Sequence, residues 1–208
     1  MTEVRPTTPD GVADAVVLLL REIPGRVRLV VDGAAAADPQ ALAERIVVAL
    51  APRPALHVRA DSFWRPAGQR LEYGHHDDMA WLDDWLDEDA LRREVLDPFV
   101  VSGRVLPALR DPVTDRSVRR SVVELPPNAV VVVSGSVLLG RGLPFDVTVH
   151  VRVSAAALRR RTPADEAWTL PALERYALER DPEALADLVV RADDPRHPAL
   201  VHRTRSTG

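Results

Sequence analysis

The stretch LVVDGAAAADPQALAER, residues 29–45, decides how this chain is expected to fold. Its first three residues are apolar and mostly β-branched, which predicts a buried strand ending at Asp32-Gly33. Four alanines follow. Asp38-Pro39 then opens a helix, because Asp is a strong N-cap and Pro is favoured at the first helical position. The stretch therefore predicts a strand, a tight loop and a helix in direct succession.

This order fits the frame of a phosphate-binding loop, G-x-x-x-x-G-K-[ST], in which a strand and a helix N-terminus flank the loop. Counted from Gly33, the second glycine falls on Asp38, the lysine on Pro39 and the hydroxyl residue on Gln40. All 27 basic residues of the chain are arginine, so no lysine is supplied from another segment. The frame is kept, and of its defining residues only Gly33 remains.

These replacements are expected to disable phosphate binding. Pro39 has no N–H group and no charge, and the alanines resist the backbone angles that glycine allows. The Asp38 carboxylate is expected to accept a hydrogen bond from the N–H of Gln40 or Ala41, at the place where an anion would otherwise bind. An ordinary strand, loop and capped helix that never bound phosphate would carry the same residues.

Length and composition set broad limits. A chain of 208 residues with 46% hydrophobic residues is expected to form one domain over residues 1–208. A net charge of −4 and a pI near 5.9 argue against general affinity for nucleic acid. The absence of cysteine excludes disulfides and thiolate chemistry, and it fits the cytoplasm. Residues 16–20 form only a five-residue apolar run, so no membrane partner is expected.

Apolar runs alternate with helical patterns along the chain, which predicts an α/β fold with a mainly parallel five-stranded sheet in a three-layer, P-loop NTPase-like arrangement. The expected strands are residues 27–31, 56–60, 129–133, 147–153 and 188–191. The expected helices are residues 10–23, 39–50, 87–96, 154–161, 171–179 and 182–186. Residues 1–9 are expected to be disordered, residues 62–79 to form a long polar loop, and residues 100–125 to form a hairpin-like insertion.

Five segments, taken together and in order, resemble the uridine kinase-like branch of P-loop nucleoside kinases. They are VRLVVDGAAAADPQALAERI (27–46), ADSFWRP (60–66), DWLDEDALRREVLDPF (84–99), AVVVVSGSVLL (129–139) and ERYALERDPEALADLVVRADDPRHPALV (174–201). The second is similar to the D-[SD]-F-[YH]-R segment of that family and the fourth to its V-[VI]-[DE]-G-[VI]-x-L strand.

The resemblance implies roles for the segment after the second expected strand. Asp61 matches the residue that accepts the proton of the nucleoside 5′-hydroxyl, so it is the expected general base. Phe63, Trp64 and Arg65 would shape the nucleoside pocket, together with Arg104. A solvated Asp61 that caps the next turn is the alternative reading of the same residue.

Other positions match the family only in part. Arg159, Arg160 and Arg161 match the arginines of its lid, which contact phosphates, although a solvated helix face explains them equally. The acid that supports the metal falls on Ser134, and the loop that seats adenine begins near Asp193. The cluster at residues 75–78, HHDD, is not expected to bind a metal, because adjacent histidines lack the i, i+4 spacing that aims two ligands at one ion.

The sequence therefore favours a uridine kinase-like protein with a degenerate phosphate-binding loop, acting as a non-catalytic nucleoside-binding, nucleotide-binding or regulatory relative. No cofactor is expected. An active uridine or cytidine kinase with an atypical site, which would need ATP and Mg²⁺, is the first alternative. A scaffold that pairs with a second copy or with an active paralogue is the second alternative.

Overall fold

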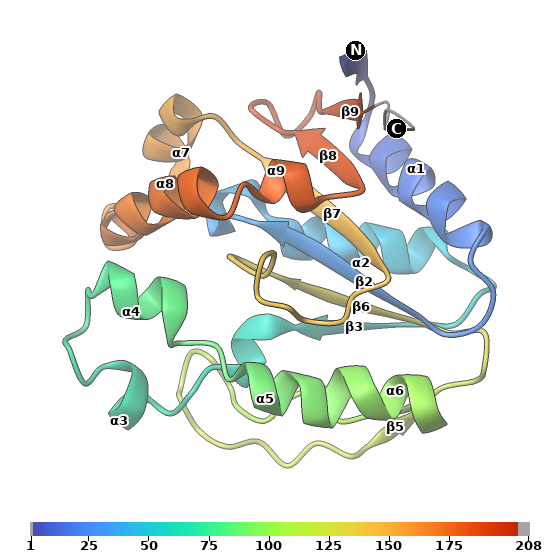
Figure 1. Cartoon of the computed structure of the whole chain (residues 1–208), viewed down its shortest axis with the longest axis horizontal. Helices are drawn as coiled ribbons and strands as arrows, with labels where there is room; N and C mark the ends of the chain where they lie inside the picture. The colour runs from blue at the N-terminus through green and yellow to red at the C-terminus, as the bar shows by residue number, and fades with distance from the viewer. Residues whose placement is uncertain (1, 204–208) are drawn as a thin grey trace.

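A computed structural model describes residues 2–203 and places seven strands in one sheet (Figure 1). The strand order is β1-β9-β8-β7-β2-β6-β3, and the five strands from β8 to β3 run parallel. The strands are β1 (Thr2–Pro6), β2 (Val27–Gly33), β3 (Ala55–Arg59), β6 (Val130–Gly135), β7 (Val147–Arg152), β8 (Leu188–Arg191) and β9 (Ala199–Arg203). The expected parallel core is confirmed, with β2 at its centre.

The strand count and the N-terminus differ from the sequence prediction. β9 runs antiparallel to β8, and β1 pairs with β9 in turn, so the sheet has seven strands and not five. Residues 2–6, expected to be disordered, therefore form a strand, in which Val4 lies opposite Val201. The pairing covers backbone groups that β9 would otherwise leave open at the sheet edge. Met1 lies outside the described residues.

Two helical layers cover the sheet, and β2 shows how its residues divide between them. Leu29 and Val31 pack in the core under α1 and α2, while Val30 between them packs in the core on the opposite face. This alternation follows from the two-residue period of a strand. The helices are α1 (Pro9–Arg21), α2 (Pro39–Ala49), α3 (Ala67–Arg70), α4 (Asp78–Asp83), α5 (Glu88–Leu91), α6 (Asp97–Ser102), α7 (Ala155–Arg161), α8 (Leu170–Glu179) and α9 (Pro182–Leu185).

Two regions have more structure than the sequence predicted. The expected polar loop at residues 62–79 contains α3 and the start of α4. The expected helix at residues 87–96 continues to residue 102 through the π-helical turn η3 (Arg92–Leu96). Pro98 has no N–H to offer the Glu94 carbonyl, which instead accepts a hydrogen bond from the Leu106 N–H at 2.9 Å.

The segment at residues 100–125 contains the short antiparallel pair β4 (Arg104–Val105) and β5 (Val123–Glu124). A second contact, an isolated bridge between Arg110 and Ser117, lies nearer the tip. Val105 is fully buried in the core beneath α5 and α6, so this segment closes that side of the molecule. Among the helices in residues 2–203, none combines the length and the apolar composition needed to cross a bilayer.

Candidate functional site

The loop after β2 uses its own backbone groups internally. The 3₁₀ turn η1 (Ala35–Ala37) is closed by hydrogen bonds from the Ala37 N–H to the Ala34 carbonyl at 2.8 Å and from the Asp38 N–H to the Ala35 carbonyl at 3.0 Å. Asp38 adopts a left-handed conformation, with φ 52°, and its Oδ1 accepts a hydrogen bond from the Ala41 N–H at 3.1 Å. The predicted Asp38 cap is confirmed, and three N–H groups of this loop and helix start already have protein acceptors.

Gly33 has a structural reason for being glycine. A Cβ built at this position would lie 2.9 Å from the Val151 carbonyl oxygen and 3.1 Å from the Val151 Cβ. The close approach of β2 to β7 therefore excludes a larger residue, whether or not a ligand ever lies over the loop.

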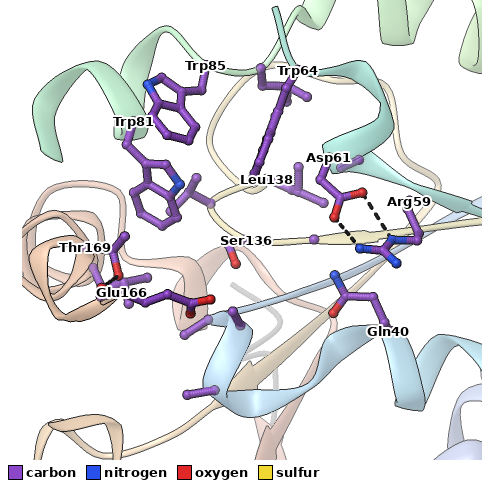
Figure 2. Close-up of a pocket in the computed structure, with 18 of the residues that line it drawn as sticks. Gln40, Arg59, Asp61, Trp64, Trp81, Trp85, Ser136, Leu138, Glu166 and Thr169 are labelled. Atoms are coloured by element: carbon purple, nitrogen blue, oxygen red, sulfur yellow. Dashed lines mark hydrogen bonds and ion pairs between the residues drawn. The ribbon is translucent and has the colours of Figure 1, made fainter. Parts of the chain in front are cut away.

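A cavity of about 560 Å³ opens beside this loop, at the carboxyl ends of β3 and β6 (Figure 2). Open α/β sheets place their ligands at this edge. All four tryptophans of the chain line it: Trp64, Trp81, Trp85 and Trp168. Trp64 and Trp85 meet edge to face with ring centroids 5.3 Å apart, and Trp168 lies 5.6 Å from Trp85 and 6.4 Å from Trp81.

Asp61 lies on the wall of this cavity, in the turn η2 (Ala60–Phe63) that follows β3. Its two carboxylate oxygens contact Arg59 at 3.1 and 2.5 Å. The hydrogen bond to Asp61 raises the pKa of Arg59, the more exposed member of the pair. Asp61 therefore faces the cavity as one half of an ion pair, and no hydrogen bond of its carboxylate to the following turn is seen in residues 2–203.

The cavity brings together only some of the residues that the sequence singled out. Trp64, Asp61, Asp38 and Gln40 line it. Phe63 is fully buried in the core instead. Two further residues expected at the nucleoside, Arg65 and Arg104, are exposed and do not line the cavity.

The three arginines of α7 do not reach this cavity either. Arg159 lines a different cavity, Arg160 is exposed, and Arg161 donates a hydrogen bond to the Ala192 carbonyl at 2.8 Å. Asp193, expected near an adenine, accepts a hydrogen bond from the Ser154 N–H at 2.7 Å. The helix after β7 and the loop after β8 are thus tied to each other.

The sequence reasoning missed most of the aromatic lining and one acid. Trp81 and Trp85 stand four residues apart, a spacing that brings them to one side of a helical turn. Glu166 precedes the 3₁₀ turn η4 (Ala167–Thr169), and its carboxylate points into the cavity (Figure 2). Trp64 and Trp85 belong to segments that the resemblance singled out, whereas Trp81 and Trp168 do not, so no motif predicted that the four rings would lie together.

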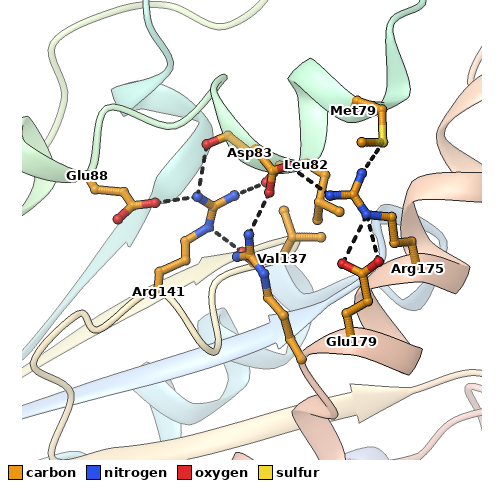
Figure 3. Close-up of polar contacts among 9 residues, drawn as sticks. Met79, Leu82, Asp83, Glu88, Val137, Arg141, Arg175 and Glu179 are labelled. Carbon is orange, nitrogen blue, oxygen red and sulfur yellow. Dashed lines mark hydrogen bonds and ion pairs between the residues drawn. The ribbon is translucent and has the colours of Figure 1, made fainter.

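Arg141 and Asp83 tie the surroundings of the cavity together (Figure 3). The Arg141 side chain is 1% exposed and donates hydrogen bonds to the Val137 carbonyl at 2.6 Å, to the Leu82 carbonyl and to Glu88. Asp83 on α4 accepts from Arg180, the residue that follows α8, at 2.7 Å and from Arg175 within α8 at 3.0 Å. These cations hold protein groups together and leave little charge to offer an anion.

The HHDD cluster also has structural contacts. The His76 ring lies 5.4 Å from Trp168, and Asp77 caps α4 by accepting a hydrogen bond from the Ala80 N–H at 2.8 Å. Ser134, at the end of β6, lies 2.7 Å from the His57 ring through its hydroxyl. Within the described part of the chain, no three His, Asp or Glu side chains are placed to hold a metal ion.

Several solved structures share this fold. A possible uridine kinase from Bacillus stearothermophilus superposes with a TM-score of 0.69 at 18% identity, over 85% of this chain and 96% of that one. A candidate fructose transport system kinase from Silicibacter sp. TM1040 gives 0.64 at 22% identity, over 88% and 98% of the two chains. The YGR205w protein gives 0.56 at 11% identity, over 93% and 99%.

No protein-family model and no curated protein matches the chain at the level of sequence. Identities this low carry the arrangement of the backbone and leave the activity undetermined. The architecture that the sequence predicted is present, with two strands added at one edge. The chain therefore shares its three-layer α/β fold with the possible uridine kinase and the candidate fructose transport system kinase.

Proposed function

We propose that this protein is a uridine kinase-like relative that binds a nucleoside in the tryptophan-lined cavity and does not transfer phosphate from ATP. The observation that carries the proposal is the Asp38 side chain, which accepts the Ala41 N–H at the start of α2. A phosphate-binding loop needs such N–H groups free. Here three of them, on Ala37, Asp38 and Ala41, are bonded within the protein.

ATP and Mg²⁺ do not fit the residues present. Pro39 and Gln40 replace the lysine and the hydroxyl of the loop, and Ser134 replaces the acid at the end of β6. A carboxylate about 4 Å from a phosphate would oppose its binding by about 4 kcal/mol per unit charge near a protein surface. Phosphoryl transfer depends on cations placed around the β- and γ-phosphates, so these losses remove the machinery of the reaction.

The chemistry of the cavity favours a neutral aromatic ligand. Indole rings stack on any nucleic-acid base, and each stacked base contributes about 1–3 kcal/mol of binding free energy. Three carboxylates line the cavity, on Asp38, Asp61 and Glu166, against two guanidinium groups, on Arg59 and Arg141, that are already in ion pairs. A nucleoside offers a base to stack and hydroxyls to donate to the carboxylates. A nucleotide would add repulsion.

Tryptophan fluorescence tests the proposal directly, because every tryptophan of the chain lines this cavity. Uridine or cytidine should change the emission with a saturable profile, and ATP with Mg²⁺ should not at millimolar concentration. The variant Trp81→Leu should weaken nucleoside binding by about tenfold or more. Tyr73→Leu, at an aromatic that is 72% exposed and outside the cavity, should leave it unchanged.

A gain-of-function variant tests the loop itself. Changing Asp38→Gly, Pro39→Lys and Gln40→Ser together frees the Ala41 N–H and adds the missing positive charge and hydroxyl, so it should create measurable ATP affinity. The matched control is Asp181→Gly with Pro182→Lys, because Asp181 caps α9 with the same left-handed geometry and does not line the tryptophan-lined cavity. Phosphate transfer to uridine by the wild type at about 1–100 per second would show an active kinase instead.

A further inference from the structure

A second cavity, of about 550 Å³, lies between β7 and the helices α7, α8 and α9. Its walls are largely apolar and include Val153, Leu158, Leu170 and Leu178. None of the four tryptophans lines it, although its lining shares Ala34 and Leu173 with the first cavity. This space is large enough for a small organic molecule.

One imidazole stands in this apolar lining. His150, on β7, is 8% exposed and lines the cavity. Its Nδ1 lies 2.7 Å from Asp32 Oδ2. The carboxylate only accepts hydrogen bonds, so Nδ1 carries the proton of this contact. No hydrogen bond joins His150 Nε2 to any group in residues 2–203, which leaves this nitrogen for a ligand.

Asp32 holds the ring in place. It is fully buried at the end of β2, and its Oδ1 accepts a hydrogen bond from the Leu138 N–H at 2.7 Å. The Tyr176 hydroxyl donates to Asp32 Oδ2 at 3.0 Å and accepts from the Leu139 N–H at 3.0 Å. A carboxylate that orients a histidine by its Nδ1 fixes where Nε2 points. The hydrogen-bonding group of the cavity is therefore preorganised.

The charged side chains of the lining bind protein groups or include both signs of charge. His150 is therefore the polar group that we expect to select the ligand. Arg152 is paired with Glu183 at 2.7 Å, and Asp181 caps α9 through the Ala184 N–H at 3.2 Å. Arg159 and Glu174 add one charge of each sign to the lining. We propose that this cavity is a second ligand site, which takes a small, largely apolar molecule whose single hydroxyl donates a hydrogen bond to His150 Nε2, since a ring that carries its proton on Nδ1 can only accept at Nε2.

The probe for this proposal is 2-naphthol, an apolar molecule with one hydroxyl group, followed by its own fluorescence. Binding to the wild-type protein should be saturable and near one to one. His150→Asn should weaken it by about tenfold, because the amide nitrogen can replace Nδ1 against Asp32 while Nε2 is lost. His57→Asn, the same change at a histidine outside the cavity, is the matched control and should leave the affinity unchanged.

A second variant keeps the test decisive if His150→Asn fails to fold. Ala177→Trp adds an indole on α8 from an exposed position in the lining, and it should abolish binding by filling the space. Octanol should displace the probe, and octanoate should displace it less well, because an ionised carboxylate has no proton to donate to Nε2. The proposal is overturned if octanol does not displace the probe, if both variants bind it as the wild type does, or if uridine competes with it.

Uridine competition also separates this proposal from the first one. The nucleoside is expected in the tryptophan-lined cavity, so Trp81→Leu should leave the affinity for 2-naphthol unchanged. Loss of nucleoside binding with intact probe binding would refute the proposed function alone. The opposite result would refute the second site alone.

Discussion

At the residue scale, Asp38 combines a helix cap with a backbone conformation that most residues avoid. Its carboxylate accepts the Ala41 N–H at 3.1 Å, and its φ is 52°. Alanine removes the cap and keeps the unfavourable φ, whereas glycine removes the cap and relieves the backbone. We expect Asp38→Ala to lower the free energy of unfolding by about 1–2 kcal/mol and Asp38→Gly by less than about 0.5 kcal/mol, measured by urea denaturation.

Asp181 supplies the control for this comparison. It also precedes a proline, has a φ of 42° and accepts the N–H of the third residue along, Ala184, at 3.2 Å. The same order, with alanine more destabilising than glycine, is expected there with no change in the tryptophan-lined cavity. Equal losses for alanine and glycine at residue 38 would mean that the left-handed backbone contributes nothing to the difference.

His57 predicts a pH dependence of stability. Burial lowers the pKa of His57 below its usual 6.5, and the ring contacts the Ser134 hydroxyl at 2.7 Å. The unfolded chain binds a proton at this residue more readily than the folded chain, so stability is present above about pH 6.5 and is lost as the pH falls below it. When the pH is lowered from about 7.5 to 5, the free energy of unfolding of His57→Asn should fall by less than that of the wild type. Urea denaturation at both pH values measures this difference. Identical pH profiles would contradict this.

At the scale of elements, Asp83 joins α4 to α8 beside the tryptophan-lined cavity. Its two oxygens accept from Arg180 at 2.7 Å and from Arg175 at 3.0 Å (Figure 3). Half-exposed pairs of this kind contribute about 0.5–1 kcal/mol. We expect Asp83→Asn to raise the hydrogen-exchange rate of residues 162–170 and to expose Trp168 to acrylamide quenching, with little loss of global stability.

Glu179→Gln is the matched variant, because Glu179 pairs with Arg175 within α8 and does not reach α4. It should leave both exchange and quenching as in the wild type. If the two variants had equal effects, the ion pairs of Asp83 on α4 with Arg175 and Arg180 would not be what holds α8 over the cavity. The pair between Arg175 and Glu179 within α8 would then matter as much.

The elements differ in how far the sequence could predict them. β2, β6 and α2 carry their own signals, an unbroken apolar run in the strands and an Asp-Pro start in the helix. β1 begins with the polar residues 2–3 and forms a strand because it pairs with the open edge of β9. This pairing joins segments about 200 residues apart, and no local sequence pattern in either segment predicts it.

At the scale of the molecule, the position of the cavity was predictable and most of its lining was not. Parallel strands gather their carboxyl ends at one edge, which placed Asp61 and Asp38 together. Trp168 joins Trp81 and Trp85 only because α8 folds back over α4. Contacts between segments that are more than 80 residues apart depend on packing, which composition and periodicity do not encode.

The charge of the whole molecule leads to the last prediction. The chain carries a net charge of −4, and three carboxylates line the tryptophan-lined cavity. The negative electrostatic potential of these groups disfavours a phosphate and has little effect on a neutral nucleoside. Uridine should therefore bind more tightly than uridine monophosphate, by about tenfold at low salt. Salt screens exposed charges over about 10 Å at 0.1 M, so the ratio of the two affinities should fall toward one as salt increases.

Tryptophan fluorescence titrations of both compounds at several sodium chloride concentrations would measure this ratio. Glu166→Gln, which removes the charge of the carboxylate that points into the cavity and keeps an oxygen that accepts hydrogen bonds, should reduce the low-salt ratio by strengthening the binding of the monophosphate. If the monophosphate bound more tightly than uridine, a working phosphate site would have to exist within this fold. In that case the internal hydrogen bonds of the loop after β2 would not be the reason for a loss of phosphate binding.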